Sequence, residues 1–158
     1  MDGLALARAL HVLAVVIWIG GVSMVTSIAL PAVRRGEFGA DRLAAFQAIE
    51  RRFVWQARGA IIIVGATGFY MIWAADLWDP FANAAFWWMH AMVGVWTLFA
   101  LGLFVVEPFV LDRRLTGWAS SRPDRFFARL GQVHWVLLLL SLITLVGAVA
   151  GSHGWPLF

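Results

Sequence analysis

Four long apolar segments, separated by short polar connections, dominate the pattern of hydrophobic and polar positions along the chain. They run over about residues 4–33, 53–73, 84–110 and 130–150. A helix needs about 20 apolar residues to cross a hydrocarbon core about 30 Å thick, so each segment is long enough to span it. The pattern predicts an all-α fold: an integral membrane, antiparallel four-helix bundle that forms a single transmembrane domain over residues 1–158.

The composition agrees with a membrane chain and excludes several classes of function. Hydrophobic residues make up 62% of the chain and charged residues 13%, whereas about 25% of residues in soluble domains are charged. The absence of cysteine excludes disulfides, iron–sulfur clusters, thiolate-bound metals and cysteine nucleophiles. The arginines behind the high pI flank the apolar segments, so we interpret them as topology signals and expect no nucleic-acid partner.

The distribution of arginines predicts the orientation of the chain. Arg8 lies near the N-terminus, and the first and third connections contain the other eleven of the twelve basic residues, all of them arginine: Arg34, Arg35, Arg42, Arg51, Arg52, Arg58, Arg113, Arg114, Arg122, Arg125 and Arg129. The positive-inside rule then places these two connections in the cytoplasm and both termini outside a bacterial-type inner (plasma) membrane. The first apolar segment is too long for a cleavable signal peptide, so we expect it to remain as a helix.

The first cytoplasmic connection, residues 34–52, is amphipathic, with Leu43, Phe46 and Ile49 at helical spacing. It predicts either a short interfacial helix or, as we favour, a simple extension of the second helix. Pro31 and Pro108 lie near the inner ends of spans one and three, where a helix is expected to kink or stop.

A weak internal repeat divides the chain into halves. A shift of 79 residues carries His11 onto His90, Arg34-Arg35 onto Arg113-Arg114, and Gly68 onto Gly147. Such a repeat predicts two helical hairpins of the same orientation. Independently of any duplication, each of these histidines precedes a double arginine by 23 residues, so both should lie about 34 Å from the inner boundary.

The two histidines at matched depth are the leading candidate site. An ionisable side chain within a span is costly unless it faces the bundle interior. Spans one and three of an antiparallel bundle lie diagonally, where two imidazoles can hold a flat cofactor between them, as in a bis-histidine haem b. We therefore expect His11 and His90 to ligate the iron of haem b. Gly94 would leave room for the macrocycle, Trp87 would wall it, and Arg8 would pair with a propionate; the alternative for the tryptophan is an outer aromatic belt.

Other ionisable residues admit two interpretations each. His134 lies five residues past Arg129, about 7 Å inside the cytoplasmic boundary, too far to share this iron. Either it ligates a second haem, with a partner supplied across a homodimer, or it hydrogen-bonds Gln132 or a backbone carbonyl, which we favour. His153 is expected to be solvated, with a spare-ligand role as the alternative. Glu107 serves a proton or quinone site or, as we favour, pairs with an arginine such as Arg58 or Arg129.

The segments RALHVLAVVIWIGG, ERRFVWQARGAIIIVGATGFY, WWMHAMVG and RFFARLGQVHWVLLLL resemble the layout of HemJ-type membrane proteins and of the related copper-resistance D (CopD) membrane domain. The resemblance covers nearly the whole chain. HemJ-type proteins bind haem b and are linked to oxidation of protoporphyrinogen, and the resemblance implies that His11 and His90 are the histidines of the first and third spans. The family pattern has a lysine shortly after the third-span histidine, whereas this chain has Met92 there and no lysine, which argues against protoporphyrinogen oxidation.

The sequence thus predicts a membrane-embedded b-type cytochrome that transfers electrons or acts on a lipophilic partner, a quinol or a porphyrinogen. One alternative is a copper-handling permease of the CopD type, which would use methionine and histidine ligands. The other is a non-catalytic structural membrane subunit, which predicts a colourless protein.

Overall fold

The computed structural model describes residues 3–115 and 121–155, without the side chains of residues 84 and 109–115. Within these two ranges the secondary structure consists of helices joined by short turns, and there is no strand. The chain is therefore all-α, as the apolar pattern predicts. In chain order the elements are α1 (Gly3–Met24), η1 (Val25–Ala29), α2 (Leu30–Arg35), α3 (Arg42–Ala74), α4 (Trp78–Phe81), η2 (Ala84–Phe86), α5 (Trp87–Leu101), η3 (Gly102–Leu115) and α7 (Pro123–Ser152).

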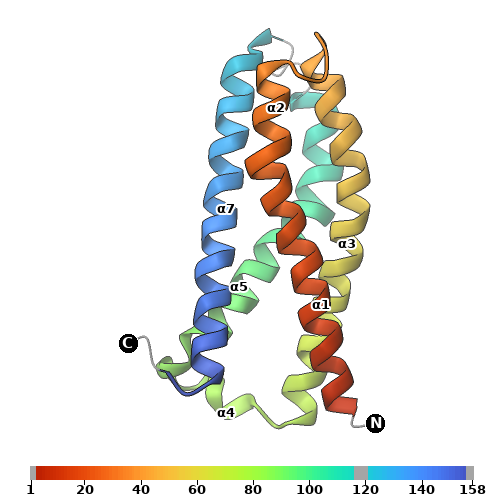
Figure 1. The fold of residues 1–158 in the computed structure, drawn as a ribbon. Helices are drawn as coiled ribbons and strands as arrows, with labels where there is room; N and C mark the ends of the chain where they lie inside the picture. Colours follow the sequence, from red (N-terminus) through yellow and green to blue (C-terminus); the bar gives the residue numbers. More distant parts are fainter. Residues whose placement is uncertain (1–2, 116–120, 156–158) are drawn as a thin grey trace.

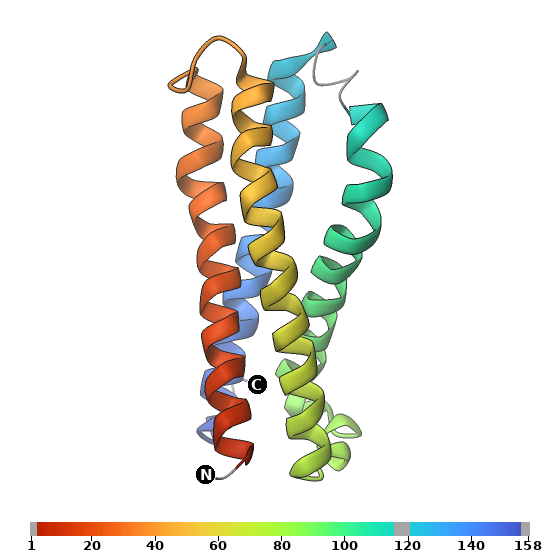
Figure 2. The same cartoon turned by 90° about the vertical axis from the view of Figure 1, so that its right-hand side faces the viewer.

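Within the described residues, four helices are long and apolar enough to cross a membrane: Gly3–Arg35, Arg42–Ala74, Trp87–Pro108 and Pro123–Ser152. They form an antiparallel bundle (Figures 1 and 2). Both chain ends and α4 lie at one end, which we call the terminal end, and the turn between α2 and α3 lies at the other, which we call the arginine-rich end (Figure 1). The length and apolar composition of these four helices indicate that the chain is a multi-pass membrane protein.

The bundle consists of two hairpins. Helix α1 packs chiefly on α3, and α5 packs chiefly on α7, with smaller contacts between α1 and α7 and between α3 and α5. The order around the bundle is therefore α1, α3, α5, α7. Helices α1 and α5 consequently lie on a diagonal, as expected for spans one and three.

Helix α3 begins well before the predicted span at residues 53–73. Its N-cap is Asp41, whose carboxylate accepts a hydrogen bond of 2.9 Å from the Ala44 amide, a standard way to satisfy a free N–H at a helix start. Residues 42–52 are thus an extension of this helix, as favoured above. The preceding helix, α2, ends at Arg35 and is capped by Gly36, whose φ of 76° is accessible to glycine at little cost.

Pro31 and Pro108 interrupt the α-helical pitch without ending the helices. The π-helical segment η1 immediately precedes the turn that contains Pro31, and Pro108 lies inside the π-helical segment η3. A proline has no N–H and its ring clashes with the carbonyl four residues earlier. The wider π turn accommodates this interruption, which is a common origin of local bends in helices.

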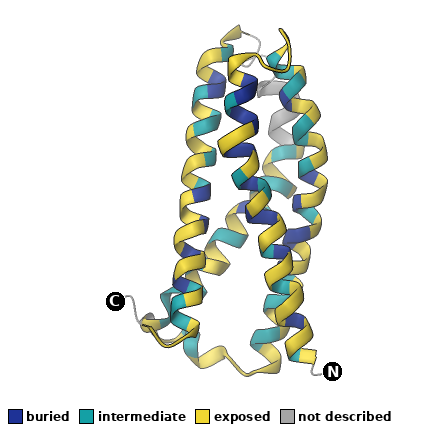
Figure 3. Cartoon of the chain, viewed as in Figure 1, coloured by how far each residue is buried: buried dark blue, intermediate teal, exposed yellow. Residues whose placement is uncertain are grey.

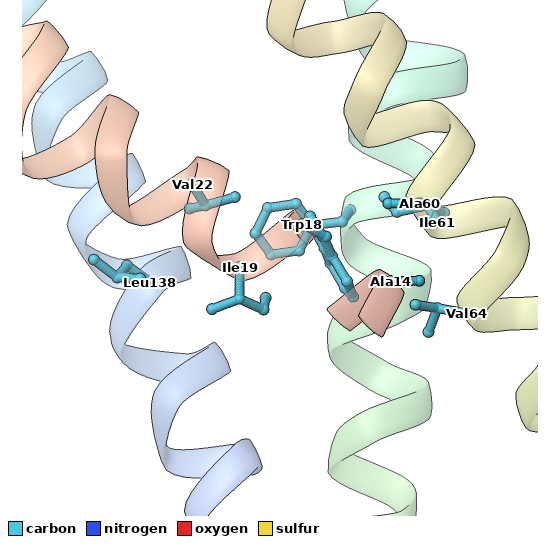
Figure 4. Close-up of a cluster of buried hydrophobic side chains, with 9 residues drawn as sticks. Ala14, Trp18, Ile19, Val22, Ala60, Ile61, Val64 and Leu138 are labelled. Carbon is cyan, nitrogen blue, oxygen red and sulfur yellow. The ribbon is translucent and has the colours of Figure 1, made fainter. Parts of the chain in front are cut away.

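Within the described residues, most buried hydrophobic side chains belong to two clusters. Many large apolar residues of the same helices are exposed, and exposed residues run along all the long helices (Figure 3). An apolar outer surface is what lipid contact requires. The cluster near the arginine-rich end contains Val25, Leu30, Val33, Phe46, Phe126 and Phe127. The mid-bundle cluster contains Ala14, Trp18, Ile19, Val22, Ala60, Ile61, Val64, Phe99 and Leu138 (Figure 4).

Candidate functional site

His11 lies on the buried face of α1. The helix buries Ala7, Ala14 and Trp18, and His11 shares their face because residues three and four apart are neighbours on a helix. Its ring packs against α3 at Gly68, where an added Cβ would lie 3.3 Å from the Cε1 atom of His11. The glycine therefore leaves the space that the imidazole ring uses.

Thr67 determines which nitrogen of His11 carries the proton. The Thr67 hydroxyl donates its single proton to Ile63 O, 2.6 Å away on its own helix. Its oxygen is then left to accept from the Nδ1 atom of His11, at 2.9 Å. His11 Nδ1 consequently bears the hydrogen, and Nε2 has the lone pair. This is the tautomer of a metal-binding imidazole that donates through its second nitrogen to a polar neighbour.

His90 lies in the first turn of α5 and contacts the connection at the terminal end. Its Nε2 atom lies 3.0 Å from Phe81 O, and a carbonyl oxygen can only accept, so Nε2 donates and Nδ1 has the lone pair. The rings of His90 and Phe81 also meet edge to face, with their centroids 5.2 Å apart. His90 thus ties α4 to the start of α5, although its side chain is exposed.

The structure does not bring His11 and His90 together. Phe99 marks the inner face of α5, because it is buried and its ring lies 4.9 Å from that of Trp18 on α1. His90 precedes Phe99 by nine residues, about 2.5 helical turns, and so points away from the inner face. The spacing of the histidines along the chain did not predict the direction of their side chains around each helix.

Trp87 packs between α5 and α7. A Cβ added at Gly147 would lie 2.5 Å from Trp87 Cη2, and one at Gly151 would lie 2.5 Å from Trp88 Cε2. Two glycines one turn apart on α7 therefore receive two indole rings. Gly68 and Gly147, which match under the 79-residue shift, both receive a ring from the partner helix of their hairpin, an imidazole in the first and an indole in the second.

The remaining residues expected around the cofactor are dispersed. Gly94 is exposed, with no heavy atom within 4 Å of an added Cβ, and it shares the outward face of His90 because it is one turn further along α5. Arg8 is also exposed, whereas Ala14, one turn from His11, is covered by the mid-bundle cluster. Gly94 therefore leaves space beside His90 only on the outward face of α5.

His134 and His153 each bond to their own helix. His134 Nδ1 donates to Leu130 O at 2.9 Å, and His153 Nδ1 donates to Val149 O at 2.8 Å. His134 is half-buried and makes the backbone bond that we favoured, while a role in a second haem stays a prediction. His153 is exposed, as the sequence predicts.

Arg58 pairs with Glu107, which confirms the favoured interpretation of that carboxylate. In a π-helix the N–H of residue i bonds to the carbonyl of residue i−5, and Pro108 has no N–H, so Pro108 cannot donate to Leu103 O. The guanidinium replaces that donor: Arg58 Nε and Nη2 lie 3.1 and 2.9 Å from Leu103 O. The pair therefore joins α3 to η3 where the proline interrupts the backbone pattern.

Two functional features were not anticipated from the sequence. Thr67, the partner of His11, lies in an apolar segment 56 residues away, and no local pattern links the two. Trp18 is buried, and its Nε1 atom has no hydrogen-bond partner within the described residues. Within those residues, no group of three or more His, Cys, Asp or Glu side chains could hold a metal ion.

No protein-family model, no curated protein and no solved structure matches this chain. The resemblance to HemJ-type and CopD-like proteins consequently stays a prediction from short sequence segments.

Proposed function

We propose that this chain is a b-type cytochrome of a bacterial-type inner membrane, with both termini outside and the arginine-rich connections in the cytoplasm. Its activity is electron transfer with, or oxidoreduction of, a lipophilic partner such as a quinol or a porphyrinogen. The orientation is supported by the eleven arginines in the two connections at one end. Haem ligation is supported above all by His11.

The observation that carries the proposal is the environment of the His11 imidazole. The ring sits on the inner face of α1, and the Thr67 hydroxyl holds the proton on Nδ1. The lone pair of Nε2 has no hydrogen-bond partner within the described residues, and Nε2 is a usual iron-binding atom of histidine. An outer partner of this kind orients the ring and raises its basicity as a ligand.

The two histidines fit haem unequally. In the arrangement seen, the Nδ1–H of His11 is bonded to Thr67, which leaves the Nε2 atom as the nitrogen that would ligate iron. In the arrangement seen, His90 does not fit as the second ligand of the same iron, because its Nε2 donates to Phe81 O and its side chain points away from the inner face of α5. Ligation by both residues therefore requires His90 to leave Phe81 and the first turn of α5 to rotate. Bound haem would supply the redox centre, and the protein would set its potential through ligation and burial.

Absorption spectra of the detergent-purified full chain, oxidised and dithionite-reduced, test this proposal. We expect a sharp Soret shift and a split α-band in the wild type, and loss of bound haem in His11→Ala. A second ligand at His90 predicts a change from low-spin to high-spin haem in His90→Ala.

His134→Ala is the matched control, because this histidine is half-buried but bonds only to its own helix; its spectrum should match that of the wild type. Circular dichroism checks that each variant retains its helices. A colourless wild-type protein, or a His11→Ala variant with the wild-type spectrum, would refute haem ligation at this residue. Metal analysis of the same samples would detect copper if the CopD-type alternative were correct.

A further inference from the structure

Two adjoining hollows lie between α2 and α7 at the arginine-rich end. The first, of about 420 Å³, and the second, of about 390 Å³, share Pro31 and Arg34 in their walls. The first is lined mainly by charged residues and the second mainly by apolar ones, so together they form an amphipathic groove. The walls of the groove include Pro31, Arg34, Arg42, Gly131 and Trp135.

Arg34 differs from the neighbouring arginines in its lack of a carboxylate partner. Arg35 pairs with Glu37, and Arg42 pairs with Asp124 at 2.9 Å. Within the described residues Arg34 forms no ion pair. Its side chain instead extends across the groove, where a Cβ added at Gly131 of α7 would lie 4.0 Å from Arg34 Nη1. The groove therefore presents an uncompensated positive charge where its charged and apolar parts meet.

We propose that this groove binds one anionic phospholipid, with its phosphate at Arg34 and an acyl chain along Pro31 and Trp135. A guanidinium suits a phosphate because it offers several N–H donors in one plane. The apolar walls of the second hollow offer few hydrogen-bond donors to a free anion, but they suit a hydrocarbon chain. The inference rests on the proposed orientation, which places Arg34 at the cytoplasmic leaflet, where anionic lipids attract basic residues next to a span.

Native mass spectrometry of the detergent-purified full chain tests the proposal by titration with phosphatidylglycerol and with phosphatidylcholine of the same acyl chains. We expect phosphatidylglycerol to bind more tightly. Arg34→Gln should weaken phosphatidylglycerol binding about fivefold, as loss of one basic contact with an anionic lipid implies, and leave phosphatidylcholine unchanged. The side chain is exposed, so the variant should fold as the wild type does.

Arg52→Gln is the matched control, because it removes the same charge from an exposed position of α3 that lines neither hollow. It should bind both lipids as the wild type does. Gly131→Leu fills the apolar part and should weaken binding of both lipids. Equal weakening by Arg34→Gln and Arg52→Gln would overturn the proposal in favour of a diffuse positive field. Equal wild-type affinity for the two lipids, or displacement of phosphatidylglycerol by equimolar inorganic phosphate, would overturn it too. None of these outcomes depends on haem.

Discussion

The contact between Gly147 and Trp87 allows the packing of the second hairpin to be tested by adding one methyl group. In Gly147→Ala the new Cβ would lie 2.5 Å from Cη2 and 2.7 Å from Cζ2 of the indole. Carbon atoms normally pack about 3.5–4.0 Å apart, so the ring has to move by roughly 1 Å. The ring is large, rigid and packed against α7, so this movement strains the hairpin.

The expected loss of stability follows from two opposing effects. Overpacking of this kind costs about 1–3 kcal/mol, and replacement of a helical glycine by alanine recovers about 0.5–1 kcal/mol. Gly147→Ala should therefore destabilise the protein by about 0–2.5 kcal/mol. Gly20→Ala is the matched control, because an added Cβ meets no heavy atom within 4 Å there, and only the gain of about 0.5–1 kcal/mol remains.

Reversible unfolding in mixed detergent micelles, followed by circular dichroism, measures both changes. Trp87→Phe removes the Cη2 and Cζ2 atoms, so Gly147→Ala should cost less in that background, and a double-mutant cycle should show a coupling energy of at least about 0.5 kcal/mol. If Gly147→Ala proves as stable as Gly20→Ala, or if its cost is unchanged by Trp87→Phe, the described packing of α5 on α7 is wrong.

Three further predictions concern polar groups inside the bundle. Thr67→Val leaves the Nδ1–H of His11 without its acceptor and should weaken haem affinity about 10–100-fold in a haem titration, while unchanged affinity would contradict the proposed role of this hydroxyl. Arg58→Gln should destabilise the protein by about 1–3 kcal/mol in the same unfolding assay. The loss should be smaller when Glu107→Gln is also present, and additive effects of the two substitutions would show that the two side chains are not coupled. Trp18→Phe removes a buried N–H that has no partner in the described structure, so it should leave the stability unchanged or raise it. Trp18→Ala should lower the free energy of unfolding by about 3–5 kcal/mol. Equal losses for the two variants would show that the indole N–H is satisfied.

The sequence by itself determined the helices, the multi-pass architecture and the concentration of arginine at one end. These features follow from local composition, because hydrocarbon admits only segments that satisfy their own backbone hydrogen bonds and carry apolar side chains. The pairing of Glu107 with an arginine could also be predicted, since a carboxylate near a span end requires a nearby cation, although the sequence left Arg58 and Arg129 open as its partner.

Only the tertiary structure decided which way each side chain points. Helices that are apolar on every face carry little periodicity to distinguish the interior of the bundle from lipid, unlike the amphipathic helices of soluble proteins. His11 and His90 therefore look equivalent in the sequence. In the structure, however, His11 bonds to Thr67 on α3, whereas His90 points away from the inner face of α5 and bonds to Phe81. The difference arises from packing between helices, where glycine positions determine which rings fit, and that information lies in residues far apart along the chain.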